Sequence, residues 1–354
     1  MPQTWHEALV TAIFKKGDVA SCENYRPISL LPIGYKLYAA VLLSRLKAAG
    51  AEARIWKTQY GFRSGRGTSE ALFVARRLMD DAWAQKDGSL VFLALDWAKA
   101  FDSVSPSALL TALGRFGVPS EFVEAVGSIY TDRSFAVKDA GNISSQHPQF
   151  FGISQGCPLS PFLFSILMTL LISDATRKLH SHMGPPIDLP VDELIYADDT
   201  LVVGVQADRV QAFMNYIQQA GENYGLAFNW RKLELLPVRC EAAIAKPDGN
   251  VIASKDSIVY LGSLLSKSGK IGPELSRRLA AARSDFCTLA KVWSHSNITM
   301  QKKLRVRRLH HVETIVLLAH CVAKYIRAGE AQCFSSSLST QDSWHSPFAH
   351  QPDK

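Results

Sequence analysis

Residues 194–203 read Leu-Ile-Tyr-Ala-Asp-Asp-Thr-Leu-Val-Val. Two short apolar runs flank a polar triplet, a pattern that predicts a strand, a tight turn and a second strand. Asp198 and Asp199 would then lie at the tip of a buried hairpin. Paired aspartates in a turn are often turn-forming residues only. Carboxylates beside a buried strand are costly to desolvate, however, and they favour a cation nearby.

A third carboxylate follows another apolar run. Residues 90–95 (Leu-Val-Phe-Leu-Ala-Leu) predict a short buried strand, and Asp96 comes directly after it, either as a site residue or as a cap for the next segment. If the two strand ends meet, Asp96, Asp198 and Asp199 converge on a pair of divalent ions. Mg²⁺ prefers such carboxylate oxygens together with substrate phosphates. Two ions of this kind can activate a hydroxyl and stabilise a leaving group.

The remaining patterns mix helices with strands. Residues 133–151 predict a hairpin, because Gly141 and Asn142 stand between two alternating segments. Helices are predicted over six ranges: 35–49, 68–85 (with Thr68 or Ser69 as the N-cap), 106–116, 119–130, 159–180 and 208–224. This mixture indicates an α+β fold rather than a regular alternation of strands and helices.

Composition and charge narrow the class of protein. The chain has 354 residues, 47% of them hydrophobic, yet no apolar run is long enough to span a membrane and no secretory signal opens the sequence. The net charge is +7, and residues 267–327 hold 13 lysines and arginines but 3 acidic residues. Such a block is expected of a surface that follows a phosphate backbone, although a solvated basic face is the plainer alternative.

Read in order, eight motifs resemble the reverse transcriptase family of non-LTR (LINE-type) retrotransposons. They are K-K-G-D (15–18), N-Y-R-P-I-S-L-L (24–31), Q-Y-G-F-R-S-G-R-G-T (59–68), L-D-W-A-K-A-F-D-S-V (95–104), G-I-S-Q-G-C-P-L-S-P (152–161), Y-A-D-D (196–199), G-L-A-F-N-W-R-K (225–232) and Y-L-G (260–262). Each motif is a weak signal alone, and the order of all eight carries the resemblance.

The resemblance implies a right-hand polymerase fold, in which an antiparallel palm sheet packs on helices. It divides the chain into fingers and palm over 1–266 (fingers about 1–90 and 105–150, palm about 91–104 and 151–266), a basic helical thumb over 267–327 and a disordered tail over 328–354. The thumb would be incomplete, because the family's usual Leu-Tyr-Gly ending is missing from it.

The resemblance also assigns catalytic roles. Asp96, Asp198 and Asp199 match the family's metal-binding aspartates, in agreement with the interpretation from the strand ends. Lys232 matches the lysine near the leaving pyrophosphate and would act as a general acid, with a plain surface lysine as the alternative. Phe101 matches the bulky residue that excludes a ribose 2′-hydroxyl, and a core aromatic is its alternative.

Further residues are assigned to substrates. The incoming nucleotide is assigned to Lys15, Lys16, Arg26, Phe101, Gln155, Gly156 and Tyr196. Template and primer are assigned to Arg63, Arg66, Tyr260, Leu261, Gly262, Arg277 and Arg278. Alternatives stay open at positions besides Phe101. One of Lys15 and Lys16, rather than both, would hold the triphosphate. Arg63 and Arg66 would support the fingers or lie in a solvated loop, and Gln155 and Gly156 would belong to a structural strand-to-helix turn.

The function that the resemblance implies is RNA-directed DNA synthesis with two Mg²⁺ ions. The expected partners are an RNA template, a DNA primer and deoxynucleotides, in the nucleus, with endonuclease activity from a missing region or another protein. Two alternatives remain: an inactive remnant that at most binds nucleic acid, and an RNA-templated RNA polymerase, which Phe101 argues against.

Overall fold

The computed structural model describes residues 1–139, 141–295, 297–303 and 305. The chain forms two compact units, Met1–Gly269 and Lys270–Lys354. Among the helices of the described residues, none is both long and apolar enough to cross a membrane. The predicted tail over 328–354 lies outside the described residues.

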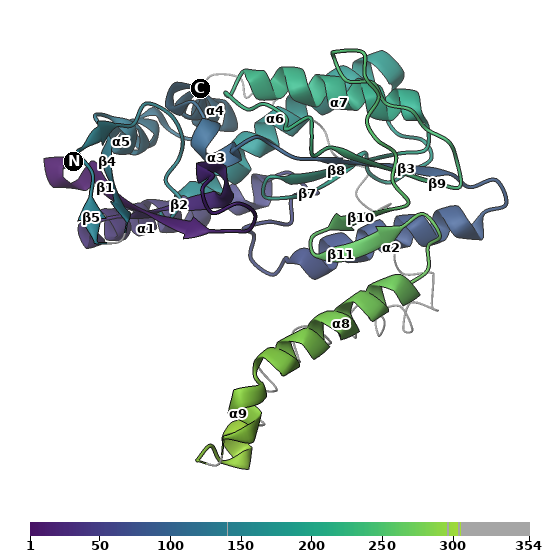
Figure 1. The fold of residues 1–354 in the computed structure, drawn as a ribbon. Helices are drawn as coiled ribbons and strands as arrows, with labels where there is room; N and C mark the ends of the chain where they lie inside the picture. Colours follow the sequence, from purple (N-terminus) through teal and green to yellow (C-terminus); the bar gives the residue numbers. More distant parts are fainter. Residues whose placement is uncertain (140, 296, 304, 306–354) are drawn as a thin grey trace. The chain divides into compact units, whose positions relative to one another are not determined.

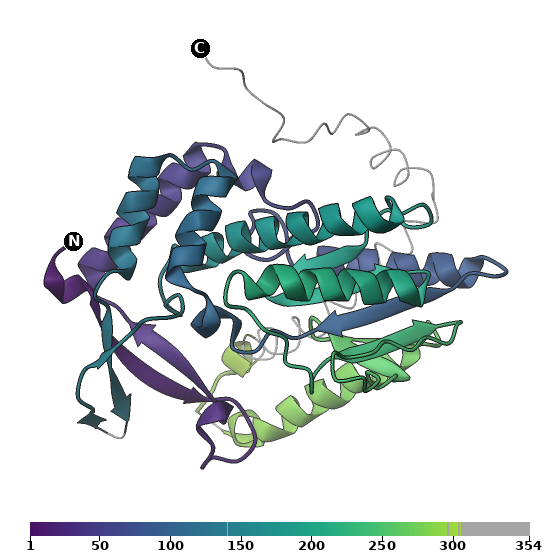
Figure 2. The same ribbon diagram turned by 90° about the horizontal axis from the view of Figure 1, so that it is seen from above.

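A four-stranded antiparallel sheet forms the centre of the first unit (Figures 1 and 2). Its order is β7 (Glu193–Tyr196), β8 (Asp199–Gly204), β3 (Leu90–Leu95) and β9 (Glu234–Val238). Leu95 pairs with Thr200, and Tyr196 pairs with Asp199. The three strands predicted from apolar runs are therefore neighbours in one sheet.

Helices cover both faces of this sheet. The helices α6 (Ser160–Met183) and α7 (Ala207–Glu222) lie side by side on one face, and α2 (Thr68–Ala84) lies against the other (Figures 1 and 2). Val91 and Leu93 pack toward α6 and α7, whereas Leu90 and Phe92 join the core formed with α2. Because successive strand residues point to opposite faces, a strand covered on both sides needs the unbroken apolar run that β3 has.

A second sheet lies beside the helices α1 (Ile33–Ala48), α4 (Pro106–Phe116) and α5 (Ser120–Tyr130) (Figure 2). It contains β1 (Glu7–Phe14), β2 (Tyr25–Leu30), β4 (Ser134–Asp139), β5 (Asn142–Ile143) and β6 (His147–Pro148). β1 pairs antiparallel with β2 and parallel with β4. The hairpin predicted around Gly141 and Asn142 is confirmed by the pairing of β4 with β5.

Smaller elements complete the first unit. They are the 3-10 helices Gln3–Trp5, Cys22–Asn24 and Ala51–Arg54, the short helix α3 (Ala100–Ser103), and the hairpin of β10 (Ser257–Tyr260) with β11 (Ser263–Ser266). The mixed α+β class and the polymerase-type fold are confirmed.

The start of α2 differs in detail from its prediction. Gly67, rather than Thr68 or Ser69, is the N-cap residue. The Glu70 carboxylate accepts a hydrogen bond from the Gly67 backbone N–H at 2.8 Å. A carboxylate in the first turn therefore satisfies the free end of the helix, and the cap needs no side chain of its own.

In the second unit, α8 (Gly272–Thr288) and α9 (Ala290–Ser294) are described. The buried Glu274 carboxylate pairs with Arg277 at 2.8 Å and also with Arg278. The first part of the predicted basic block is thus helical, and its continuation beyond residue 305 lies outside the described residues.

Candidate active site

The connection between β7 and β8 is a two-residue loop. Tyr196 pairs with Asp199, so only Ala197 and Asp198 lie between the strands. Asp199 is therefore the first residue of β8, not part of the turn as the apolar runs predicted. Ala197 adopts a left-handed backbone with φ of 58°. This conformation lets the chain reverse in two residues and presents adjacent carboxylates at the end of the sheet.

Asp96 lies at the same end of the sheet. It directly follows Leu95, which pairs with Thr200, so the next position along β3 stands opposite Asp199. Burial, then the charges of Asp198 and Asp96, raise the pKa of Asp199 to about 6. Burial also raises the pKa of Asp198; Asp96 adds to this and Arg26 opposes it. The two strand ends thus bring three negative charges together.

These carboxylates have the chemistry of a divalent-metal site. Across the described residues, no three acidic, histidine or cysteine side chains already form a group that would hold a metal ion. The donors at this end of the sheet are nevertheless all carboxylate oxygens, which suit Mg²⁺. Burial of the charged form and repulsion between the carboxylates raise the pKa values of Asp198 and Asp199. A divalent cation bound between them would offset both costs by favouring the charged form.

Lys232 reaches the same place from the segment after α7. Its Nζ atom lies 3.4 Å from Oδ2 of Asp96. The Asn229 backbone N–H donates to the Asp96 carbonyl at 2.7 Å, and the Lys232 N–H donates to the Asn229 carbonyl at 2.9 Å. Asn229 therefore ties the turn that carries Lys232 to the end of β3.

Phe101 lies five residues after Asp96 in the sequence and is packed between other groups. Its ring stacks on Phe164 with centroids 4.8 Å apart, and its carbonyl accepts from the Ile153 N–H at 2.7 Å. The next residue, Asp102, accepts a hydrogen bond from Gln155 Nε2 at 3.2 Å. Burial raises the pKa of Asp102, while Gln155 and nearby lysines lower it. Asp102 was not assigned a role from the sequence.

The loop that carries Gln155 and Gly156 lies against β2. The Ser29 N–H donates to the Gln155 carbonyl at 2.8 Å. Gly156 has φ of 125°, and a Cβ there would lie 2.5 Å from the Ser29 carbonyl oxygen. Only glycine fits this close approach. Arg26 lies three residues before Ser29 in β2, and its positive charge partly opposes the rise in the pKa of Asp198.

Comparisons with known proteins agree with this geometry. Residues 13–265 match the family described as "Reverse transcriptase (RNA-dependent DNA polymerase)". The chain belongs to the reverse transcriptase family. It is a domain of the non-LTR retrotransposon type, so the resemblance found in the sequence is confirmed.

Two curated relatives and one solved structure illustrate the match. The chain is 30% identical to the Xenopus laevis "Transposon TX1 uncharacterized 149 kDa protein", over 75% of this chain and 20% of that protein. It is also 30% identical to the Drosophila melanogaster "RNA-directed DNA polymerase from mobile element jockey", over 65% and 25%. The apo telomerase of Candida tropicalis shares the fold, with TM-score 0.54, 14% identity, and coverage of 75% of this chain and 54% of that one. The chain thus spans a fifth to a quarter of these curated relatives.

Two arginines assigned to nucleic acid make contacts inside this reverse transcriptase domain. Arg63 donates to the carbonyls of Trp56, Gln59 and Glu52 at 3.1–3.4 Å, and burial lowers its pKa. Arg66 donates to the Lys57 carbonyl at 2.6 Å. These contacts favour the alternative in which both arginines support the fingers.

Tyr260 ends β10, and Leu261 and Gly262 form the turn that leads into β11. The Tyr260 side chain is buried, its hydroxyl lies 3.4 Å from the Leu194 carbonyl, and burial raises its pKa. Leu261 and Gly262 both have positive φ. The Tyr260 ring therefore belongs to the core, and the turn exposes Gly262. Lys16 lies in the exposed connection between β1 and β2.

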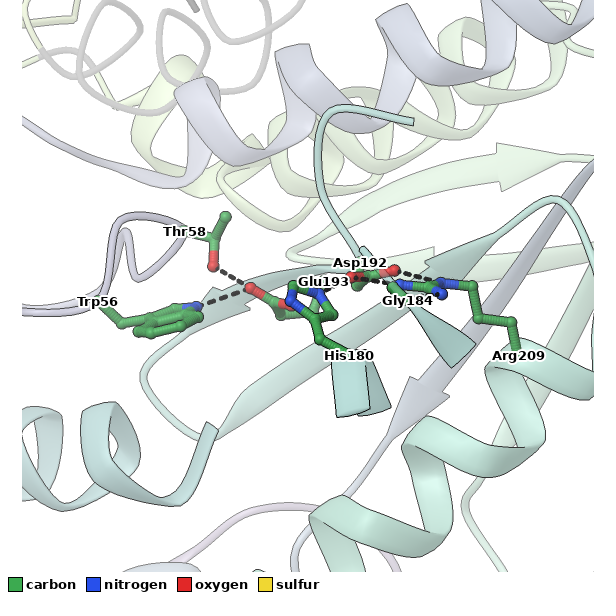
Figure 3. Close-up of polar contacts among 7 residues, drawn as sticks. All are labelled: Trp56, Thr58, His180, Gly184, Asp192, Glu193 and Arg209. Atoms are coloured by element: carbon green, nitrogen blue, oxygen red, sulfur yellow. Dashed lines mark hydrogen bonds and ion pairs between the residues drawn. The ribbon is translucent and has the colours of Figure 1, made fainter. Parts of the chain in front are cut away.

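A buried polar network at the start of β7 was missed by the sequence analysis (Figure 3). Glu193 Oε1 accepts from Trp56 Nε1 at 2.7 Å and from Thr58 Oγ1 at 2.6 Å. Asp192 binds Arg209 at 2.8 Å and lies 3.3 Å from His180 Nε2. Burial raises the pKa of Glu193 to about 7. Asp192 and Glu193 follow a Pro-rich loop, and two acidic residues in that place are typical of an exposed turn. No local sequence pattern therefore predicted that they are buried.

Proposed function

We propose that this domain catalyses RNA-directed DNA synthesis. The single observation that carries the proposal is the meeting of Asp96, Asp198 and Asp199 at one end of the palm sheet. In the proposed reaction the primer 3′-oxygen bonds to the α-phosphorus of a deoxynucleotide, and the bond from that phosphorus to the β-phosphate oxygen breaks. Pyrophosphate leaves, and the hydroxyl proton passes to solvent or to a base.

Asp96, Asp198 and Asp199 would hold two Mg²⁺ ions. When bound, such ions would make the primer hydroxyl more acidic and would neutralise negative charge on the phosphates. The protein's contribution is an oxygen-rich site whose carboxylates gain from a cation. Burial, and then the charges of Asp198 and Asp96, raise the pKa of Asp199 to about 6.

Basic residues around the carboxylates would bind the triphosphate. The charge of Arg26 opposes the rise in the pKa of Asp198, so the two groups lie close together. The charge of Lys15 opposes the rise in the pKa of Asp102 in the same way. A guanidinium can grip phosphate oxygens through two hydrogen bonds, and a lysine supplies a compact charge. Lys232, beside Asp96, would donate a proton to the departing pyrophosphate as a general acid.

Phe101 would select the sugar of the nucleotide. Its ring packs flat against Phe164, so it has little freedom to move away from a ribose 2′-hydroxyl. The clash would favour deoxynucleotides over ribonucleotides. This residue separates the proposal from an RNA-templated RNA polymerase with a similar palm.

The partners follow from the same proposal. An RNA template and a DNA primer would bind this domain, and the arginines of α8 in the second unit would bind phosphates independently. Endonuclease activity would come from another region of a longer protein or from another protein. The reaction would take place in the nucleus, where target DNA lies.

Primer extension tests the proposed reaction. The purified chain is given poly(rA)/oligo(dT), Mg²⁺ and either dTTP or UTP. We expect extension with dTTP and little extension with UTP. Equal or better use of UTP would favour an RNA polymerase, and RNA binding without extension under Mg²⁺ or Mn²⁺ would favour an inactive remnant.

A further inference from the structure

Gln59 is a buried polar residue next to the catalytic hairpin. Its side chain is 1% exposed. Its Oε1 atom accepts hydrogen bonds from the Ala197 N–H at 2.9 Å and from the Gly61 N–H at 2.8 Å, and its Nε2 atom lies 3.3 Å from the Ala197 carbonyl oxygen. One carboxamide thus binds both backbone groups of the residue that precedes Asp198.

The backbone around Gln59 is joined to β7 as well. The Ile195 N–H donates to the Thr58 carbonyl at 3.0 Å, and the Tyr60 N–H donates to the Ile195 carbonyl at 2.8 Å. A Cβ at Gly61 would lie 2.3 Å from the Ala197 nitrogen. The segment from Thr58 to Gly61 therefore packs against the hairpin backbone with no room for a side chain at Gly61.

Ala197 needs such support because of its conformation. A left-handed backbone is unfavourable for a residue with a Cβ, and Ala197 has φ of 58°. It also occupies half of a two-residue loop, so rotation at Ala197 would move the Asp198 carboxylate directly. The Gln59 carboxamide suits the position because it donates and accepts at once and brings no charge beside three carboxylates.

We propose that Gln59 is a positioning residue that fixes Ala197 and thereby sets the metal-binding geometry of Asp198. The inference rests on the proposed function, because it assigns the carboxylates to Mg²⁺. Gln59 does not touch substrate in this proposal. Its effect on the reaction passes through the backbone of the hairpin.

The matched variants are Gln59→Met and Gln211→Met. Methionine keeps the length of the side chain and removes its hydrogen bonds. Gln211 makes the same pair of bonds to one backbone residue: its Oε1 accepts from the Ala245 N–H at 2.6 Å and its Nε2 donates to the Ala245 carbonyl at 3.0 Å. Loss of a side-chain clamp on one backbone residue is thus common to both variants. Gln211 is half-buried and lies away from the site, and only Gln59 contacts the hairpin.

Three measurements on the full chain test the inference: amide hydrogen exchange at Ala197, Mn²⁺ binding followed by electron paramagnetic resonance, and the kcat and KM for dTTP in primer extension. For Gln59→Met we expect faster exchange at Ala197 and Mn²⁺ binding weakened at least threefold. We expect kcat to fall about tenfold to a hundredfold, with KM within about threefold, since small displacements of catalytic groups have such effects. Gln211→Met should leave all three unchanged.

Unchanged Mn²⁺ binding and kcat in Gln59→Met would overturn the inference, even if exchange at Ala197 rises. If Gln59→Met does not fold, Gln59→Asn replaces it: the shorter carboxamide cannot reach Ala197, and unchanged Mn²⁺ binding would again overturn the inference. If the wild-type chain binds Mn²⁺ through Asp198 but extends no primer, the proposed function fails, and Mn²⁺ binding alone decides the role of Gln59.

Discussion

At the scale of single residues, Phe101 is held from both sides. Phe164 stacks beneath it, and the ring of Phe62 meets its edge at 6.4 Å and 83°. Phe62 itself has φ of 59°, an uncommon backbone for a bulky side chain. The ring of Phe62 thus lies against Phe101 although its backbone adopts an uncommon conformation.

Shortening Phe101 should relax the choice of sugar. The Phe101→Val variant removes the ring that would face the 2′ position of the sugar. The ratio of kcat/KM for dTTP to kcat/KM for UTP should therefore fall about tenfold to a hundredfold. This fall is equivalent to about 1.4–2.7 kcal/mol. Steady-state extension with each nucleotide measures the ratio. The kcat/KM for dTTP is the internal control and should change little; an unaltered ratio would remove Phe101 from this role.

Lys232 should affect catalysis more than binding. It lies 3.4 Å from Asp96 and is well exposed, so its removal should cost little stability. A general acid contributes about 10²–10⁴-fold to the rate, and we expect Lys232→Ala to lower kcat toward that range with a modest change in KM. Arg231→Ala, one residue earlier and exposed, is the control. Equal kcat values for the two variants would show that Lys232 is an ordinary surface lysine.

At the scale of elements, β7 is anchored at both ends by the segment from Trp56 to Gly61. Glu193 binds Trp56 and Thr58 at the start of the strand, and Gln59 binds Ala197 just after its end. The start of the motif at 59–68, which the resemblance places in the fingers, therefore hydrogen-bonds to β7 and to the hairpin that follows it. Figure 3 shows the Glu193 end of this arrangement.

The Glu193 anchor predicts a pH dependence of stability. Burial raises the pKa of Glu193 from 4.5 to about 7, so the folded chain binds this proton more tightly than the unfolded chain does. Its contribution is present below the unfolded pKa and is lost as pH rises from about 4.5 toward 7. Glu193→Gln keeps an acceptor for Trp56 and Thr58 without the charge.

We therefore expect Glu193→Gln to raise the free energy of unfolding at pH 8 by about 1–3 kcal/mol relative to wild type, and to raise it much less at pH 5. Urea unfolding at the two pH values measures the difference. Glu241→Gln, at an exposed position, should show no such trend. A variant less stable than wild type at pH 8 would mean that the ionised carboxylate is the form that holds the anchor.

At the scale of the whole molecule, the sequence predicts the features that depend on residues adjacent in the chain. The apolar runs of β3, β7 and β8 identify three strands, and the residues that follow β3 and β7 include the three carboxylates to which we assign catalysis. The strands β1 and β2 escape prediction because the sequence from Glu7 to Leu30 lacks a clean alternation. The contacts of Gln59 escape it too, since its partner Ala197 lies 138 positions away.

The basic charge of the second unit predicts salt-dependent binding. Each lysine that contacts a phosphate adds about 0.9 to the slope of log affinity against log salt. In Lys291→Gln/Lys302→Gln we expect the slope for an RNA/DNA hybrid to decrease by about 1–2. Fluorescence anisotropy at several salt concentrations measures it. Lys86→Gln/Lys178→Gln, two exposed positions of the first unit, is the charge-matched control, and equal slopes would assign the basic helices to a merely solvated face.

The central claim is that Asp96, Asp198 and Asp199 form one site for nucleotidyl transfer. The most direct measurement compares extension of oligo(dT) on poly(rA) by the wild-type chain and by Asp198→Ala, with Mg²⁺ and dTTP. We predict that the wild type extends the primer and that the variant loses at least about 10³-fold in rate, because a metal ligand is removed while the fold is kept. Extension that persists at the wild-type rate in Asp198→Ala would contradict the account.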